Sequence, residues 1–341
     1  YGENADGLAA KLTVGYGNVF DGCIAYRNSD DGWDLYAKTD SGNIGCVIIY
    51  NCVAFENGYL EYTQADNNAR FPKFNKDYTE IFNEGDDVRY FRTRDGDGNG
   101  FKLGGSVMEG DVVMYNCLSF NNRMHGVTDN SNPGIISIKN VTSYNNSAWV
   151  DDNPESPYFG YILDVSNPDT HANIDLARQI YSYNNINHVL SLSDSLAKSL
   201  DNDAYRASVV DSILLNKRIE GSIDADTKNE DGATGDTVAQ PATAEVFSQL
   251  PFTKTVTSVP GEEGGEPTLQ TSYTFNITGL EDLYKADSNE TELNPDRAHV
   301  KYRNAADGSV NMGEILKVKD YSKLLGDDNK IGCVLNLTSY G

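Results

Sequence analysis

The chain has 341 residues and a formal net charge of −24, because 51 acidic side chains outnumber 27 basic ones. This charge excludes nucleic acid and an anionic membrane surface as the main partner. No run of 18 apolar residues is present that would span a bilayer as a helix. A hydrophobic fraction of 39%, with 21 Tyr and 12 Phe, excludes a disordered chain, so one large domain or two ordinary domains are expected.

One phrase recurs along the first 190 residues and indicates stacked β-strands. Each copy has an apolar residue or Cys, then Ala or Ser, an aromatic residue and Asn. Three copies follow an apolar alternation such as "VIIYN" (47–51), which is typical of short strands. Units of about 24–39 residues that end in the same turn predict an all-β fold, a right-handed parallel β-helix. The copies are "CIAYRN" (23–28), "CVAFEN" (52–57), "CLSFNN" (117–122), "VTSYNN" (141–146) and "IYSYNN" (180–185).

Stacking places equivalent residues of successive rungs about 4.8 Å apart, so each position of the phrase becomes a column. The asparagines are expected to form an internal ladder whose amides bond to the rungs above and below, with the aromatic rings stacked beside it. Cys23, Cys52 and Cys117 share one rung position and are expected to be small buried hydrophobic residues. The ladder is Asn28, Asn57, Asn122, Asn146 and Asn185, and the aromatic column is Tyr26, Phe55, Phe120, Tyr144 and Tyr183.

The predicted β-helix occupies residues 1–245 and has two interruptions. One is an insertion at about residues 58–98, and the other is a polar loop at about residues 217–245. Residues 246–341 are expected to be a C-terminal covering segment that packs on or caps the β-helix.

Glycines that follow the turn set the register between rungs. "GWDL" (32–35) begins four residues after Asn28, whereas its counterpart "GFKL" (100–103) begins 43 residues after Asn57. Removing an insertion of about 39 residues restores a rung of ordinary length. Two columns follow: the first contains Asp6, Asp31, Asn99 and His125, and the second contains Ala9, Asp34, Lys102 and Thr128.

Acidic side chains gather where these two columns meet. Strand alternation places Trp33 and Phe101 inside, so Asp34 and Lys102 point outward on the same face. Four carboxylates on two neighbouring rungs need a counter-ion, and Ca²⁺ prefers oxygen ligands. We therefore predict a Ca²⁺ site rather than a solvated acidic turn, with ligands Asp6, Asp30, Asp31 and Asp34.

A second acidic run, "DGDGNG" (95–100), matches the first half of an EF-hand loop. We reject an EF-hand because Ser106 stands where that loop needs a bidentate Glu. A second, minor ion at Asp95 and Asp97 stays open.

An outward lysine beside Ca²⁺ suits β-elimination in a polyuronide. The ion binds the carboxylate of a uronic acid and acidifies the proton on the adjacent C5. Lys102 is the candidate base that removes this proton, after which the 4-linked sugar leaves. A glycoside hydrolase would need paired acid and base carboxylates instead. A non-catalytic β-helix that binds polysaccharide through a structural Ca²⁺ is an alternative from another class.

Three stretches resemble family 9 polysaccharide lyases, the β-helical pectate lyases: "NSDDGWDLYAK" (28–38), "NGFKLGG" (99–105) and the repeated rungs. The resemblance implies a Ca²⁺-dependent pectate lyase that cleaves polygalacturonate, with the four aspartates as calcium ligands and Lys102 as base. A rhamnogalacturonan lyase with the same chemistry is the close alternative. That family has several rungs before its first calcium aspartate, so we expect further rungs upstream or on another piece.

The implied partner is an acidic plant cell-wall polysaccharide, and the implied location is secreted, cell-surface or periplasmic, as for a bacterial-type extracellular enzyme. We expect a monomer. Lys38, Arg123 and His125 are weaker candidates for contacts with the anionic sugar chain. Basic and aromatic residues alternate in the insertion, which either grips the substrate or packs on itself.

Overall fold

The computed structural model describes two long stretches of the chain, residues 4–62 and 96–146, and several shorter ones. The shorter ones include residues 246–261, 267–277, 302–304, 306–319 and 332–335. For six further strands the structure describes the backbone but not the side chains: 89–92, 174–175, 180–183, 186–190, 207–210 and 213–217. Within these residues no helix is long and apolar enough to cross a membrane.

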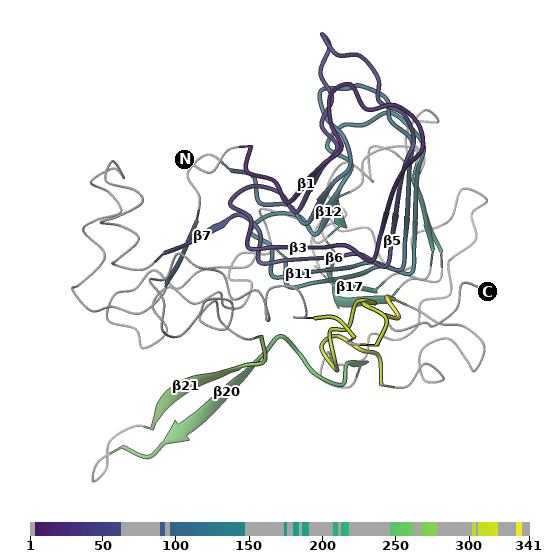
Figure 1. The fold of residues 1–341 in the computed structure, drawn as a ribbon. Coiled ribbons are helices and arrows are strands. Elements are labelled where there is room, and N and C mark those ends of the chain that lie inside the picture. Colours follow the sequence, from purple (N-terminus) through teal and green to yellow (C-terminus); the bar gives the residue numbers. More distant parts are fainter. Residues whose placement is uncertain are drawn as a thin grey trace, which may run out of the picture. The chain divides into compact units, whose positions relative to one another are not determined.

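Three parallel sheets wind around a common core (Figure 1), which confirms the predicted all-β parallel β-helix. The first sheet has the order β1 (Leu8–Ala9), β4 (Trp33–Asp34), β9 (Phe101–Lys102), β12 (Val127–Thr128), β15 (Ile174–Asp175). The second has β2 (Asn18–Asp21), β5 (Val47–Tyr50), β10 (Val112–Tyr115), β13 (Ile136–Lys139), β16 (Ile180–Tyr183), β18 (Ala207–Val210). The third has β3 (Ile24–Tyr26), β6 (Val53–Phe55), β11 (Leu118–Phe120), β14 (Thr142–Tyr144), β17 (Ile186–Leu190), β19 (Ile213–Lys217).

Apolar side chains of alternate strand positions fill the interior. Trp33 and Phe101 are fully buried, and their rings stack with centroids 4.5 Å apart. Leu35 and Leu103 are buried in the same way on the same two rungs. Because side chains alternate between the two faces of a strand, the polar residue between each aromatic residue and its leucine points outward.

The asparagine ladder is present over four rungs. Side-chain amides donate to the next rung from Asn28 to Asn57 (2.9 Å), from Asn57 to Asn122 (2.8 Å) and from Asn122 to Asn146 (2.7 Å). The aromatic column beside it is also formed, since Phe55 stacks on Tyr26 at 4.8 Å and on Phe120 at 4.9 Å. Cys52 and Cys117 are fully buried as predicted, whereas Cys23 is half-buried.

The fifth copy of the phrase lies in a different sheet from the first four. Strand β16 pairs with β13, which sets Tyr183 opposite Lys139, whereas β14 pairs with β17. The prediction that Tyr183 stacks beside Tyr144 is therefore wrong. "IYSYN" (180–184) also fits the apolar alternation of the second sheet, and "INHVL" (186–190) supplies the strand of the third sheet. Asn185 lies outside the described residues.

A hairpin separates the second and third rungs. Strands β7 (Tyr59–Tyr62) and β8 (Arg89–Arg92) pair antiparallel, and the described chain resumes at Gly96. Gly58 and Gly98 lie at the base of this hairpin with positive φ angles of 86° and 80°. A Cβ atom on Gly58 would lie 2.5 Å from the Cα of Gly98, so only glycine permits this approach.

Residues 242–320 form a separate compact unit. In it β20 (Phe252–Val259) and β21 (Thr268–Phe275) pair as an antiparallel hairpin. The last described residues, 332–335, belong instead to the β-helix unit. There the backbone of Val334 exchanges hydrogen bonds with the Asn116 side chain, and Cys333 N–H donates to Thr142 Oγ1 (2.8 Å). The predicted division into a β-helix (1–245) and a segment that packs on or caps it (246–341) stays a prediction.

Replacement of a ladder asparagine should destabilise the β-helix strongly. Asn122 is fully buried, and its side chain bonds to Asn57, Ser119 and Asn146. We expect Asn122→Ala to lower the free energy of unfolding by about 2–4 kcal/mol, because buried partners lose their hydrogen bonds. Denaturant unfolding measures this change. The control Asn43→Ala, at an exposed site, should cost less than about 1 kcal/mol, and equal losses would contradict the prediction.

Candidate metal-binding and catalytic site

The first sheet brings the predicted site residues together in the predicted register. Asp34 pairs with Ala9 on one side and with Lys102 on the other, and Lys102 pairs with Thr128. Backbone hydrogen bonds from Gly32 to Asn99 and from Gly100 to His125 align the other column. The site therefore extends across β1, β4 and β9 on their outward face.

A polar ladder runs along the start of these strands. Asp31 N–H donates to Asp6 Oδ1 (3.3 Å), Asn99 N–H to Asp31 Oδ1 (2.7 Å), and His125 N–H to Asn99 Oδ1 (3.2 Å). The Asn99 amide adds a second bond to Asp31 Oδ1 (2.9 Å). Each side chain is thus fixed by the rung above it.

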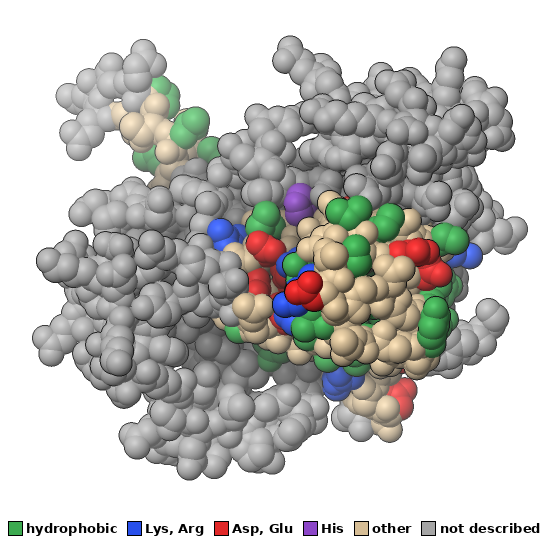
Figure 2. Space-filling model, turned by 90° about the horizontal axis from the view of Figure 1, so that it is seen from above, with side chains coloured by type: hydrophobic (Ala, Val, Ile, Leu, Met, Phe, Trp, Pro, Cys, Tyr) green, Lys and Arg blue, Asp and Glu red, His purple; other side chains and the backbone are tan. Residues whose placement is uncertain are grey.

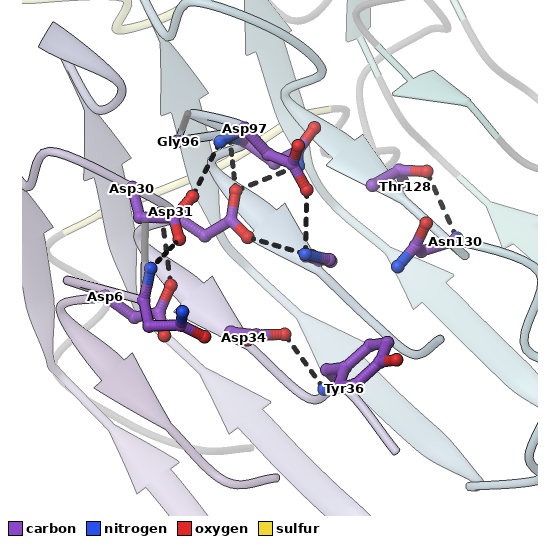
Figure 3. A network of polar contacts seen from close by, with 12 residues as sticks. Asp6, Asp30, Asp31, Asp34, Tyr36, Gly96, Asp97, Thr128 and Asn130 are labelled. Carbon is purple, nitrogen blue, oxygen red and sulfur yellow. Dashed lines mark hydrogen bonds and ion pairs between the residues drawn. The ribbon is translucent and has the colours of Figure 1, made fainter. Parts of the chain in front are cut away.

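In three aspartates the backbone holds one carboxylate oxygen and leaves the other for a cation. Oδ1 of Asp6 accepts from Asp31, and Oδ1 of Asp31 accepts from Asn99, as described above. Oδ1 of Asp34 accepts the N–H of Tyr36 (2.9 Å). Figure 3 shows these carboxylates on neighbouring strands, with the Tyr36 contact beside them. Preorganised oxygens of this kind suit a metal ion or an ammonium group.

The spacing of the carboxylate oxygens and the burial of Asp31 suit a bound Ca²⁺ ion. One oxygen from each of Asp6, Asp31 and Asp34 lies within 4.8 Å of the other two, close enough for one ion to bridge them. Asp31 is fully buried, and its Oδ2 accepts no hydrogen bond from the described residues, although the Lys102 ammonium lies 3.1 Å from it. A buried carboxylate oxygen without a hydrogen bond is costly unless a cation faces it. Hard oxygen donors carrying negative charge are the ligands that Ca²⁺ prefers.

Two lysines occupy the free oxygens. Lys102 Nζ lies 3.1 Å from Asp31 Oδ2 and 2.9 Å from Asp97 Oδ2. Lys11 Nζ lies 2.7 Å from Asp6 Oδ2 and 2.8 Å from Asp34 Oδ2. In Figure 2 acidic and basic side chains accordingly lie side by side near the middle of the described surface.

Asp30 differs from the other three predicted ligands. Its Oδ1 accepts the N–H of Asp97 (2.6 Å), and its Oδ2 accepts the N–H of Asn4 (2.5 Å). Both oxygens therefore serve backbone amides, and Asp30 is not part of the close group of oxygens formed by Asp6, Asp31 and Asp34. Burial raises the pKa of Asp30.

The electrostatics of the site leave Lys102 protonated. Burial raises the pKa of Asp31 to about 7, although the Lys102 ammonium lowers it. Desolvation lowers the pKa of Lys102, but the carboxylates of Asp31, Asp34 and Asp97 outweigh it and hold that pKa above its ordinary value. Neutralisation of the carboxylate charge around Lys102 would lower that pKa.

The three weaker candidates lie around this cluster in different ways. Lys38 is exposed in the turn after β4, where its backbone bonds to Ser41. The Arg123 guanidinium donates to the carbonyl of Gly96, so it holds the loop that carries Asp97. His125 lies in the aspartate column, two rungs from Asp31, as predicted. Roles for all three in substrate binding stay predictions.

Column alignment missed Lys11 and Tyr36. Lys11 lies 25 positions before Tyr36, so a rung of that length pairs it with an aromatic residue rather than with Asp34. A usable signal is the five-residue spacing from Asp6 to Lys11, which recurs from Asp97 to Lys102, and both pairs are in contact. The Tyr36 ring lies 5.7 Å from Lys102 Nζ, and its hydroxyl bonds to Ser106 Oγ (2.8 Å).

Residues 1–70 and 76–155 match the family described as "Pel9A-like, right handed beta helix region". "Pectate lyase L" of Paenibacillus polymyxa (strain SC2) is 46% identical over 145 residues, which make up 42% of this chain and 26% of that protein. "Pectate lyase L" of Thermoclostridium stercorarium is 43% identical over 145 residues, 42% of this chain and 9% of that protein. A solved structure, "Crystal structure of pectate lyase Pel9A", aligns with 71% of this chain and 48% of its own at 24% identity and a TM-score of 0.33. The chain thus spans about a quarter or less of the length of these two relatives.

The pH dependence of stability in the absence of metal should report on Asp31. Its pKa rises from 3.8 to about 7 on folding, so the folded protein binds more protons than the unfolded chain between these values. The contribution of Asp31 to the free energy of unfolding therefore falls as pH rises through this window. Asp31→Asn removes that loss, so the stability of this variant relative to the parent protein should increase from about pH 5 to about pH 8.

Urea unfolding with a chelator present, at the two pH values, measures this difference. The control Asp40→Asn makes the same charge change at an exposed position. A relative stability of Asp31→Asn that does not vary with pH would contradict the assigned pKa.

Proposed function

We propose that the protein is a family 9 polysaccharide lyase, a Ca²⁺-dependent pectate lyase that cleaves polygalacturonate by β-elimination; the match of residues 1–70 and 76–155 to the Pel9A-like β-helix region supports this. One observation carries the proposal. Lys102 Nζ lies 3.1 Å from Asp31 Oδ2, one strand above Asp34, beside carboxylate oxygens of Asp6, Asp31 and Asp34 that lie within 4.8 Å of one another. The names of the relatives support the substrate class.

Asp6, Asp31 and Asp34 would hold the ion, with Asp30 beside them as the fourth predicted ligand, and Lys102 would act as base. A bound Ca²⁺ would withdraw electron density from the uronic acid carboxylate and so acidify the proton on C5. The unprotonated Nζ of Lys102 takes that proton, the C5–H electron pair forms the C4=C5 double bond, and the C4–O bond breaks. The oxygen leaves with the electron pair of the broken bond. The product carries an unsaturated sugar at its new end.

Neighbours of Lys102 orient its ammonium group. Asp97 accepts a hydrogen bond from Nζ at 2.9 Å, and the Tyr36 ring lies 5.7 Å away on another side. Neutralisation of Asp31 and Asp34 by the ion would remove two of the charges that raise the pKa of Lys102, which favours its unprotonated form in the loaded site. Asp30 holds the Asp97 backbone and so supports this arrangement from behind.

Loss of the Lys102 amine should abolish elimination while the protein keeps its fold and still binds Ca²⁺. We expect Lys102→Met to lower kcat on polygalacturonate by about 10³-fold, because proton transfer loses its base. Ultraviolet absorbance of the new C=C bond measures the rate. The control Lys139→Met removes the same charge from an exposed residue of the second sheet. Full activity of Lys102→Met would show that another group is the base.

Removal of the ion should abolish activity reversibly. We expect a chelator to stop the reaction and added Ca²⁺ to restore it, since Asp6, Asp31 and Asp34 offer oxygen ligands. Asp34→Asn should weaken Ca²⁺ binding in calorimetry by at least about tenfold, because it removes a charged ligand. Activity that survives chelation would contradict the metal assignment.

A substrate panel separates the alternatives. Polygalacturonate and the rhamnogalacturonan backbone both contain a uronic acid with a leaving group at C4, so each is offered to the parent protein. Release of unsaturated product from the second substrate alone would assign a rhamnogalacturonan lyase. Binding of either polymer without unsaturated product would assign a non-catalytic β-helix. The proposed substrate lies outside cells, which supports an extracellular location for the enzyme.

A further inference from the structure

Lys11 is a second lysine at the carboxylate cluster. Its Nζ bridges Asp6 Oδ2 at 2.7 Å and Asp34 Oδ2 at 2.8 Å. The two carboxylates are nearly inaccessible, with 2% and 6% of their side chains exposed, whereas 20% of the Lys11 side chain is exposed. Lys11 thus contacts two carboxylates on neighbouring rungs and retains access to water.

The backbone near Lys11 fixes its position beside Asp34. Strand β1 ends at Ala9, and Leu12 adopts a positive φ of 66°. Leu12 N–H donates to the carbonyl of Tyr36 (2.7 Å), two residues beyond Asp34. The turn after β1 is therefore attached to the turn after β4. This attachment of the two turns places the Lys11 ammonium within reach of both the Asp6 and the Asp34 carboxylates.

Lys11 uses the carboxylate oxygens that a metal ion would use. Backbone amides hold Oδ1 of Asp6 and of Asp34, so Oδ2 of each remains for a cation, and Lys11 contacts both. A positive ammonium and a Ca²⁺ ion repel each other and compete for the same two oxygens. Lys102 contacts Asp31 and Asp97 instead, so the two lysines divide the cluster between them.

We propose that Lys11 is a built-in counter-ion that occupies the Asp6–Asp34 side of the site in the metal-free protein and that Ca²⁺ must displace. The proposal rests on the proposed function, because it concerns the same ion. It has two consequences. Lys11 stabilises the metal-free protein by neutralising two apposed carboxylates, and it weakens the apparent affinity for Ca²⁺. Loading of the site then needs a higher free calcium concentration than it would without Lys11.

Calorimetric titration of the chelator-stripped protein with CaCl₂ tests the competition. We expect Lys11→Met to bind Ca²⁺ about tenfold more tightly than the parent protein, because the ion no longer displaces an ion pair. Lys11→Arg keeps the charge and should bind like the parent protein. Lys139→Met makes the same charge change on another sheet and should leave the affinity within about twofold. Equal or weaker binding by Lys11→Met would overturn the proposal.

Thermal unfolding gives a second readout that does not depend on activity. Without Ca²⁺, Lys11→Met should melt below the parent protein, because Asp6 and Asp34 then face each other without a counter-ion. With saturating Ca²⁺ the two should melt together, and a deficit that persists there would identify Lys11 as purely structural and overturn the proposal. If neither protein binds Ca²⁺, the proposed metal site itself fails, which is distinct from equal affinities.

Discussion

Hydrogen bonds between a backbone N–H and a side-chain oxygen of the neighbouring rung hold this molecule in register. They form two ladders that run in opposite directions on either side of one turn. In the asparagine ladder the oxygen of the upper rung accepts from the backbone below, as Asn57 Oδ1 does from Asn28 N–H (3.1 Å). In the aspartate ladder the oxygen of the lower rung accepts from above, as Asp31 Oδ1 does from Asn99 N–H (2.7 Å). Both ends of the turn at residues 28–31 are therefore fixed, which also fixes the positions of the side chains that point outward from it.

Stacking explains how much of the fold and site could be predicted. Rung lengths and glycine positions place Lys102 beside Asp34, because parallel pairing converts sequence spacing into spatial neighbours. The fifth repeat was misassigned because its residues satisfy the patterns of two different sheets. Lys11 was not predicted to lie at the site because its position depends on the left-handed backbone conformation of Leu12. Alignment of rungs by sequence spacing contains no information on such turns. Likewise, spacing could not reveal that backbone amides occupy both oxygens of Asp30.

Two lysines offset part of the negative charge at the site, which holds five aspartates in a chain of net charge −24. Two lysines sit among the aspartates, and each takes the oxygens that the backbone leaves free. In the proposed function the arrangement combines a protonated base with an internal substitute for the ion. Ca²⁺ binding would change both features at once, since it would offset part of the carboxylate charge that raises the pKa of Lys102 and would displace Lys11. One binding event would then prepare the site for an anionic polymer and for proton transfer.

The glycine pair at the base of the β7–β8 hairpin determines where the inserted segment joins the rung. Gly58 and Gly98 approach so closely that the chain leaves the rung and returns to it at the same point. Backbone bonds from Gly58 to Asn28 and from Arg123 to Asn57 pass this point uninterrupted. Backbone bonds close the rung that carries Lys102, and the end of the excursion adds a side chain to its surroundings. Asp97, one residue before Gly98, lies 2.9 Å from Lys102 Nζ, so the excursion contributes to the environment of that lysine at the point where the chain returns to the rung.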